Sequence, residues 1–346
     1  MKAGSISRRA ALTSLASAAA MVGPLGRLQA QETKLSVSWY PGLLGANFRR
    51  SFLDTFADKD RVVVTESFDS PRFTQMQASR AKPNTDVAAF IDVLMPLVAR
   101  SGLVSKLDAA RIPNLANVDP ALMTWDGFAV PAAYGSWGIV YNAKWVSKPI
   151  VSWGDLLRDD LKGHVTHPNV TYNSSIYSLD AFARLGNGDL RSPEAGMKSI
   201  RQIRLSGPGL WEQDSIAVGW LKTEEIWATP YFSGSVLALM QDKDVPDLRF
   251  VVPSEGAYAV PLNVAKVANA PNGALADGFI DHILGEAAQN AWTINGRTRP
   301  ANRNVAVSAE IAASVPEIGK LRRIDWDYFS QNRAALVASW NDIVNR

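Results

Sequence analysis

The chain has 346 residues, of which 47% are hydrophobic and 20% are charged, and it contains no cysteine. Residues 1–30 hold four of the 36 basic residues and none of the 33 acidic ones, so the remainder is close to neutral. This balance excludes the basic face that nucleic-acid binding requires. The lack of cysteine excludes disulfides, thiol catalysis and cysteine metal sites.

The first 30 residues have the pattern of an export signal. Arg8 and Arg9 precede an apolar run over 12–25 that is too short to cross a bilayer, and Leu28-Gln29-Ala30 is typical of a cleavage site. We expect a twin-arginine signal peptide over residues 1–30, and therefore a periplasmic protein. An amphipathic first helix is the alternative.

The segments that follow alternate between strands and helices. Strands are predicted over 34–39, 61–65 and 85–90, with one helix starting at 47 and another over 73–80. Phe48, Phe52 and Phe56 recur every four residues, as they would on one face of a helix. This order is typical of an α/β protein with doubly wound sheets.

The remainder continues the same pattern, and its length favours a second lobe. Two strands are expected to flank a turn, and Ser152 is expected to cap a helix. The predicted strands lie at 128–131, 138–142, 164–166, 225–228 and 248–253. The predicted helices lie at 94–102, from 152, and at 178–185, 193–206, 216–221, 274–284, 286–294 and 326–344.

The sequence contains no motif of a known catalytic or cofactor site. Of the three histidines, His164 and His167 lie close together, but two ligands do not complete a metal site. The nucleophile elbow, the zinc-protease helix motif and the phosphate-binding loop are absent. We therefore expect no metal, no cofactor and no enzymatic activity. A secreted enzyme that uses a carboxylate pair is the alternative from another class.

Ten short motifs occur in a characteristic order along the chain. They are T-D-V at 85–87, G-L-V-S-K-L-D at 102–108, I-P-N-L at 112–115, V-P at 130–131, G-I-V-Y-N at 138–142, S-W-G-D-L at 152–156, L-K-G-H-V at 161–165, P-S-E-G-A at 253–257, A-A-Q at 287–289 and R-P-A-N at 299–302. In these motifs the chain resembles the periplasmic solute-binding proteins of ABC importers. The resemblance is to the group that contains polyamine, ferric-iron and aminoethylphosphonate binders.

The resemblance implies a two-lobed periplasmic binding protein fold, with doubly wound sheets joined by a two-segment hinge. On that model lobe one comprises 31–132 and 259–303, and lobe two comprises 133–258 and 304–346. The lobes close on a small polar solute by a hinge motion, and the closed form docks on an ABC permease in the inner membrane. The implied protein is a monomer with no nucleic-acid partner.

The residues expected to bind the solute are mostly aromatic. Rings and carboxylates together suit a desolvated ammonium group, and ligands of open α/β sheets bind at the carboxyl ends of strands. We expect the ligand-binding residues to be Trp39, Tyr40, Phe90, Tyr134, Ser136, Tyr172, Tyr231 and Glu255.

Two classes of solute stay open. A polyamine-type amine is favoured, although Tyr258-Ala259 replaces the Trp and Asp of polyamine binders. An organic anion or aminophosphonate is the alternative, because serine and glycine clusters can supply hydroxyl and N–H donors, with Arg72 as a partner. These clusters are Gly135-Ser136, Asn173-Ser174-Ser175 and Ser233-Gly234-Ser235. Iron is not expected, because Tyr231-Phe232 breaks the tyrosine pair of ferric binders.

Overall fold

The structure is a computed structural model that describes residues 34–243, 245 and 247–346. The predicted signal peptide lies outside these residues. Within the described part of the chain, no helix is both long and apolar enough to cross a membrane.

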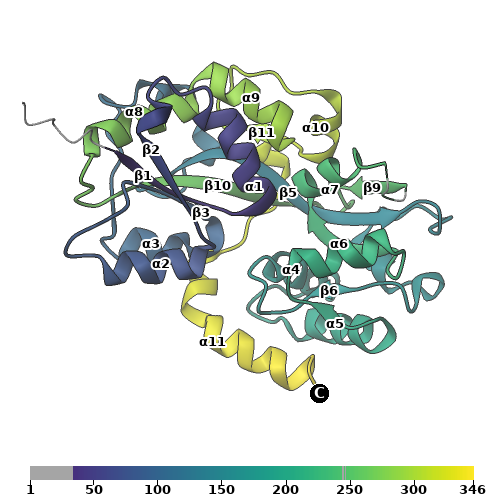
Figure 1. Cartoon of the computed structure of the whole chain (residues 1–346). Coiled ribbons are helices and arrows are strands. Elements are labelled where there is room, and N and C mark those ends of the chain that lie inside the picture. Colours follow the sequence, from purple (N-terminus) through teal and green to yellow (C-terminus); the bar gives the residue numbers. More distant parts are fainter. Residues whose placement is uncertain (1–33, 244, 246) are drawn as a thin grey trace, which may run out of the picture. The chain divides into compact units, whose positions relative to one another are not determined.

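A mixed sheet of nine strands dominates the described residues (Figure 1). Its main path runs β11-β5-β10-β3-β1-β2, while β4 pairs with β10, and β8 and β9 pair with β5. Strand β1 is parallel to β2 and β3, whereas β10 is antiparallel to β3 and β5. A second, two-stranded sheet pairs β6 with β7. The strands are β1 Leu35–Trp39, β2 Val62–Glu66, β3 Val87–Ile91, β4 Val104–Ser105, β5 Val130–Asn142, β6 His167–Pro168, β7 Leu210–Trp211, β8 Ala228–Phe232, β9 Leu248–Val251, β10 Tyr258–Val267 and β11 Arg299–Pro300.

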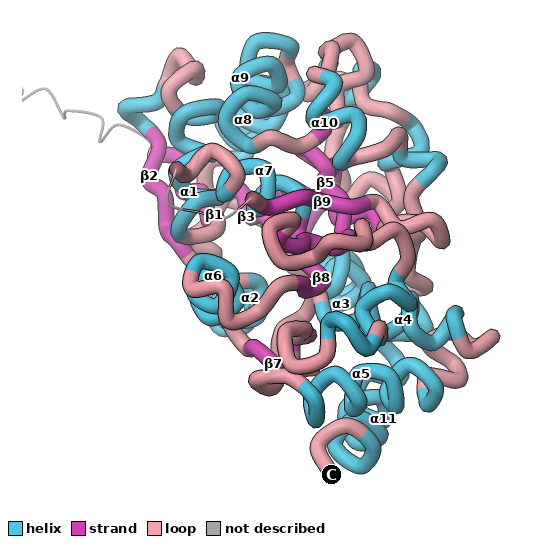
Figure 2. The backbone as a smooth tube through the Cα atoms, turned by 90° about the vertical axis from the view of Figure 1, so that its right-hand side faces the viewer, coloured by secondary structure: helices cyan, strands magenta, loops and turns pink. Residues whose placement is uncertain are grey.

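Helices connect and cover these strands (Figure 2). The α-helices are α1 Gly42–Phe48, α2 Asp69–Ala78, α3 Met95–Arg100, α4 Ser175–Leu185, α5 Glu194–Ser206, α6 Asp214–Lys222, α7 Ser233–Leu239, α8 Gly273–Leu284, α9 Glu286–Gly296, α10 Ala309–Ser314 and α11 Trp326–Ile343. A π-helical segment follows α1 at Arg49–Leu53. Short 3₁₀ turns lie at Lys59–Arg61, Asp92–Leu94, Pro113–Asn117, Pro120–Leu122, Trp153–Leu157, Asp159–Leu161 and Ile318–Lys320. The helices expected after residue 170 are confirmed to within a few residues, and the mixed α/β class is confirmed.

The prediction of two strands around a turn at 128–142 is wrong. One strand, β5, runs through the whole segment, and all 13 of its residues are buried. Within this strand, the structure needs Gly135 and Gly138 for close packing against other segments. A Cβ on Gly135 would lie 2.4 Å from the ring of Phe232, and one on Gly138 would lie 2.4 Å from the carbonyl oxygen of Val251.

Three further predicted elements differ from the structure in their bounds or type. The strand expected at 225–228 begins only at Ala228, because Glu224 has a left-handed backbone (φ 60°) that turns the chain before it. The strand expected at 164–166 is reduced to an isolated bridge between Val165 and Ala228. Ser152 does form a cap, with Asp155 as its capping-box partner, but it caps a 3₁₀ turn instead of an α-helix.

The apolar side chains form two large cores and a smaller third one. The first core is built around Trp39, Phe48 and Trp292. Of the three phenylalanines expected on one helix face, Phe48 ends α1, Phe52 lies in the π-helical segment and Phe56 follows that segment, and all three pack in this core. The second core is built around Trp137, Trp153 and Trp211. The third core contains Phe90, Met95 and Val98 beside β3.

Two neighbouring strands, β5 and β10, run from the first large core into the second. In β5, Val130 packs in the first core and Ile139 in the second, and in β10 Val264 and Tyr258 divide in the same way. The two strands are paired in register, with Tyr258 opposite Trp137. These are the segments at which the chain was expected to cross between lobes.

The last 40 residues divide between the cores. Ile311, Val315 and Ile318 pack in the first core, although residues 304–346 were assigned to lobe two. Helix α11 contributes Phe329 and Trp340 to the second core and packs against α5 (Figure 2).

The contact between α4 and α5 depends on Gly196. A Cβ at this position would lie 2.7 Å from the backbone nitrogen of Ala183 and 2.8 Å from the carbonyl oxygen of Leu179. We expect Gly196→Ala to lower the free energy of unfolding by about 1–3 kcal/mol, because the helices must separate. Gly219 in α6 is the matched control, since its Cβ would enter open space. Gly219→Ala should keep or raise stability by up to about 1 kcal/mol. Equal denaturation midpoints for the two variants would contradict this view of the contact.

A candidate ligand site where carboxylates meet aromatic rings

The first element of the site is a buried trio at the carboxyl end of β1. Tyr40 follows this strand, and its hydroxyl donates a hydrogen bond to Asp69, the first residue of α2. The guanidinium of Arg72 lies 3.6 Å from the Asp69 carboxylate and 4.7 Å from the centre of the Tyr40 ring. Burial raises the pKa of Asp69 to about 6, while Arg72 and Tyr40 oppose the rise.

Arg72 is fixed by the protein itself. Its Nε donates to the Ser38 hydroxyl at 2.8 Å, and its terminal nitrogens donate to the carbonyl oxygens of Ala89 and Ser67. The side chain is 1% exposed. Its hydrogen bonds to the backbone therefore hold the end of the sheet together and leave it poorly disposed to bind a solute anion.

The second element is Asp92, which directly follows β3. Its carboxylate accepts hydrogen bonds from Nδ2 of Asn263 at 2.8 Å and from Nε1 of Trp125 at 3.1 Å. Burial raises the pKa of Asp92 to about 6. The side chains of Asn263 and Trp125 oppose this rise most strongly, and those of Arg323 and Trp326 oppose it to a smaller extent. Asp92 is thus a buried carboxylate without a cation in hydrogen-bond contact among the described residues.

The third element is Asp214, which begins α6. The hydroxyls of Tyr172 and Tyr231 both donate to its Oδ1, at 2.9 Å and 2.8 Å. Burial raises the pKa of both tyrosines, and the charge of Asp214 raises it further. Trp211 packs between the two rings, with centroid distances of 4.6 Å and 5.6 Å.

Trp137, Tyr177 and Trp326 link the two groups of carboxylates. The ring of Trp137 lies 6.3 Å from those of Tyr172 and Tyr231 and 6.0 Å from that of Tyr177. The Tyr177 ring in turn lies 5.5 Å from Trp326, edge to face. The three rings thus form a continuous series, and the Trp326 indole lies near enough to Asp92 to oppose the rise of its pKa.

The charges of Asp69 and Asp92 act on this series of rings. Burial raises the pKa of Tyr177, and the negative charges of Asp92 and Asp69 raise it further. The charge of Asp69 also raises the pKa of Tyr172. We call the whole group the acidic–aromatic cluster, which comprises Asp69, Asp92, Asp214, Tyr40, Trp137, Tyr172, Tyr177, Tyr231 and Trp326.

Two ion pairs hold Trp326 in position. On one side Asp325 pairs with Arg191 at 2.5 Å, and on the other Asp327 pairs with Arg100 of α3. Asp325 also caps α11, accepting from the backbone N–H of Tyr328 at 2.9 Å. The start of α11 therefore connects α3, beside the third core, with the region of the second core.

Three of the eight residues expected to bind the solute meet in this cluster: Tyr40, Tyr172 and Tyr231. The others lie elsewhere. Trp39 is fully buried in the first core, stacked on Phe48, and Phe90 is in the third core. Tyr134 packs in the first core, and burial raises its pKa to about 12.

Ser136 and Glu255 are occupied by other parts of the chain. The hydroxyl of Ser136 donates to the carbonyl oxygen of Ser314, and its backbone N–H donates to the Ser233 hydroxyl. The Glu255 carboxylate accepts from the hydroxyl of Ser152 and from the backbone N–H of Trp153. It thereby joins the 3₁₀ turn at 153–157 to the loop before β10.

The sequence analysis missed the carboxylates of the cluster. Asp92 stands directly after a buried strand, a position that marks ligand sites in open α/β sheets and could have identified it. Asp69 and Asp214 begin helices, where an acidic residue is ordinary, so the sequence gives no signal that they face a site.

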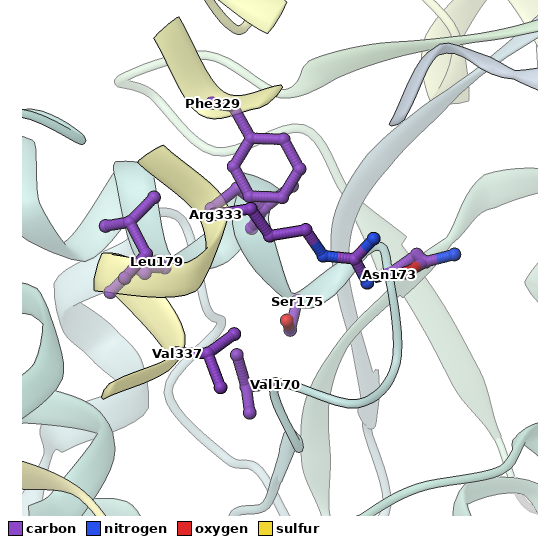
Figure 3. Close-up of a pocket in the computed structure, with 9 residues that line it drawn as sticks. Val170, Asn173, Ser175, Leu179, Phe329, Arg333 and Val337 are labelled. Carbon is purple, nitrogen blue, oxygen red and sulfur yellow. Dashed lines mark hydrogen bonds between the residues drawn. The ribbon is translucent and has the colours of Figure 1, made fainter. Parts of the chain in front are cut away.

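A small pocket outside the cluster lies between α4 and α11 (Figure 3). Arg333 of α11 points toward Asn173 and donates to its Oδ1 at 3.1 Å. The other walls are mainly apolar, with Leu179 and Val337 on facing helices, and the volume of about 20 Å³ suits a single water molecule. Among the described residues, no group of three or more His, Asp or Glu side chains could hold a metal ion.

Comparison with known proteins identifies the family of this chain. Residues 82–332 match the model of the bacterial extracellular solute-binding protein family, and the chain belongs to this family. The family implies a small-molecule ligand and an extracytoplasmic location.

Two characterised relatives and one solved structure are similar to the chain. The putrescine/agmatine-binding protein of Pseudomonas aeruginosa is 22% identical over 64% of this chain and 66% of its own length. The spermidine/putrescine-binding periplasmic protein 1 of Haemophilus influenzae is 21% identical over 70% of this chain and 69% of its own. A solved extracellular solute-binding protein from Bordetella parapertussis is 22% identical, with a TM-score of 0.77, and is matched over 90% of this chain and 99% of its own. This last likeness confirms the fold.

The raised pKa values of Asp69 and Asp92 predict how stability depends on pH. Both rise from 3.8 to about 6 in the folded protein, so between about pH 4 and pH 6 the folded state binds more protons than the unfolded state. Without ligand, each carboxyl should therefore lower the free energy of unfolding by up to roughly 3 kcal/mol as pH rises through this window.

Chemical denaturation across the window tests this expectation. Asp92→Asn should flatten the pH dependence and raise stability near neutral pH, because the amide still accepts hydrogen bonds but carries no charge. The exposed Asp60 supplies the control, and Asp60→Asn should follow the wild type. A wild-type slope retained in Asp92→Asn would show that this carboxylate is not held in a charge-excluding site.

Proposed function

We propose that this chain is the extracytoplasmic solute-binding subunit of an ABC importer and that it captures a polyamine-type amine. The observation that carries the proposal is the acidic–aromatic cluster, in which three carboxylates lie among tyrosine and tryptophan rings. Only Asp69 has a guanidinium beside it, so the cluster keeps an excess of negative charge. A desolvated ammonium group would be stabilised by these carboxylates and by the ring faces.

The cluster supplies the acids that the loop after the P-S-E-G-A motif lacks. Polyamine binders were expected to place an aspartate there, and this chain has Tyr258-Ala259 instead. Asp92 and Asp214 can take over that role from other elements. The relatives named for putrescine and spermidine agree with an amine, although their low identity supports only the family.

An anionic solute is less well supported. The hydroxyl and N–H of Ser136 are used inside the protein, as are the hydrogen-bond donors of Arg72 that point to Ser38, Ala89 and Ser67. An anion would also be repelled by the carboxylates of the cluster. The amine is therefore the proposed class of solute.

The proposal also covers where the protein acts and how it delivers the solute. Residues 1–30 direct the chain to the periplasm by the twin-arginine route, and the mature protein acts there as a monomer. The two lobes close on the amine, with carboxylates from both sides contacting it, and the closed form delivers it unchanged to a membrane permease.

Calorimetric titration with putrescine tests the proposal. Asp214→Asn keeps an oxygen acceptor for Tyr172 and Tyr231 but removes the charge, so the affinity should fall by about tenfold or more. Asp60→Asn serves again as the control and should bind as the wild type does. Unaltered affinity in Asp214→Asn would remove this carboxylate from the site. Binding of carboxylates or phosphonates instead of putrescine would reverse the class of solute.

A further inference from the structure

Two buried hydrogen-bond donors of the acidic–aromatic cluster have no partner in the part of the chain that the structure describes. These are the hydroxyl of Tyr177 and Nε1 of Trp137, on side chains that are 0% and 1% exposed. A buried polar group without a hydrogen bond is unfavourable, because the loss of its contacts with water is not compensated. Two such groups on neighbouring rings, beside buried carboxylates, call for a functional explanation.

The other polar groups of the cluster are engaged. Tyr40 donates to Asp69, and Tyr172 and Tyr231 donate to Asp214. The neighbouring Trp211 donates to the hydroxyl of Thr229 at 3.1 Å. The two free donors are therefore a local exception.

A few buried donors outside the cluster also lack partners: Trp39 Nε1, Asn142 Nδ2, Arg204 Nε and Trp340 Nε1. None of these belongs to the cluster. The donors of Trp137 and Tyr177 differ because their rings are adjacent, with centroids 6.0 Å apart and planes inclined by 35°. One acceptor group placed between the two rings could bind both.

Beside the Asp92 carboxylate lies an acceptor that has no partner among the described residues. Oδ1 of Asn263 is buried without a partner, while its Nδ2 donates to Asp92 and to the carbonyl oxygen of Phe90. The amide cannot be reversed, because its oxygen would then face the Asp92 carboxylate. Oδ1 of Asn263 and the carboxylate of Asp92 together suit the N–H groups of an ammonium ion.

Trp326 connects the acceptor side with the donor side. Its ring packs edge to face on that of Tyr177 at 5.5 Å, and its indole lies near enough to Asp92 to oppose the rise of that pKa. A ligand that spans the two sides would follow this indole, with its cationic end at Asp92 and its other end at Tyr177 and Trp137.

We infer that the ligand is an amine that also carries a neutral oxygen acceptor, such as an amide carbonyl or a hydroxyl, and that Tyr177 and Trp137 bind this oxygen. The inference rests on the proposed function and narrows its class of solute. An unsubstituted alkyl polyamine offers only donors at that end and would leave both protein donors unpaired. A carboxylate is disfavoured, because the charges of Asp92 and Asp69 act on the Tyr177 hydroxyl.

The test compares two probes of similar length, butylamine and γ-aminobutyramide, by calorimetric titration of the full mature chain. The wild type should bind the amide more tightly than the simple amine by roughly tenfold, because only the amide satisfies the two donors. In Tyr177→Phe this ratio should fall to about threefold or less. The folding of the variant should be unimpaired, since the hydroxyl removed has no partner.

Two further variants separate a binding role from a general effect on packing. Trp137→Phe should lower the same ratio through the second donor. Tyr328 lies on α11 outside the cluster, and Tyr328→Phe should leave the ratio at the wild-type value.

The results that would overturn the inference differ from those that would overturn the proposed function. Equal affinity of the wild type for the two probes, or a ratio unchanged in Tyr177→Phe, would overturn the inference while leaving an amine-binding function intact. Failure of both probes and of putrescine to bind would overturn the proposed function together with it.

Discussion

The burial of Asp92 beside the carboxyl end of β3 is the interaction on which the functional account depends. Taking a carboxylate out of water is unfavourable, and the pKa of about 6 expresses this cost. Hydrogen bonds from Asn263 and Trp125 offset part of this cost. No cation among the described residues contacts the carboxylate directly. A cationic solute would supply the missing charge, so that binding would relieve an unfavourable feature of the free protein.

The fold brings the parts of the site together through two strands and one helix. Strands β5 and β10 run side by side from the first core into the second, and β5 places Trp137 there beside Tyr177. The start of α11 is fixed to Arg100 and Arg191 by flanking aspartates. Trp326 lies between those aspartates in the sequence, with its ring edge to face on that of Tyr177. Any motion that separates the two cores would have to rearrange the start of α11 as well.

Much of the fold could be predicted from the sequence, because it rests on local patterns. The buried strand at 85–90 and the amphipathic helices after residue 170 show the periodicity of their secondary structure. Strand β5 could not be predicted as one element, because a pair such as Gly135-Ser136 has the same appearance in a loop and in a closely packed strand. Only the positions of Phe232 and Val251, far along the chain, decide between the two.

The site could be predicted only in part, for a similar reason. Tyr40, Tyr172 and Tyr231 were identified as aromatic residues near expected loops, and the structure does bring them to the cluster. Trp39 was expected to line a cleft, but its side chain points into the first core. The alternation of side chains along a strand does not say which of the two faces the last residue occupies. Asp214 and Trp326 are distant in sequence from the other members, and a single sequence carries no information on that proximity.

The most direct test of the account is a crystal structure of the mature protein with putrescine or γ-aminobutyramide bound. We expect the ammonium nitrogen within hydrogen-bond distance of the Asp92 carboxylate, with the rings of Trp137 and Tyr177 against the ligand. An amine bound elsewhere, with Asp92 still held only by Asn263 and the indoles, would contradict the central claim that the acidic–aromatic cluster is the binding site.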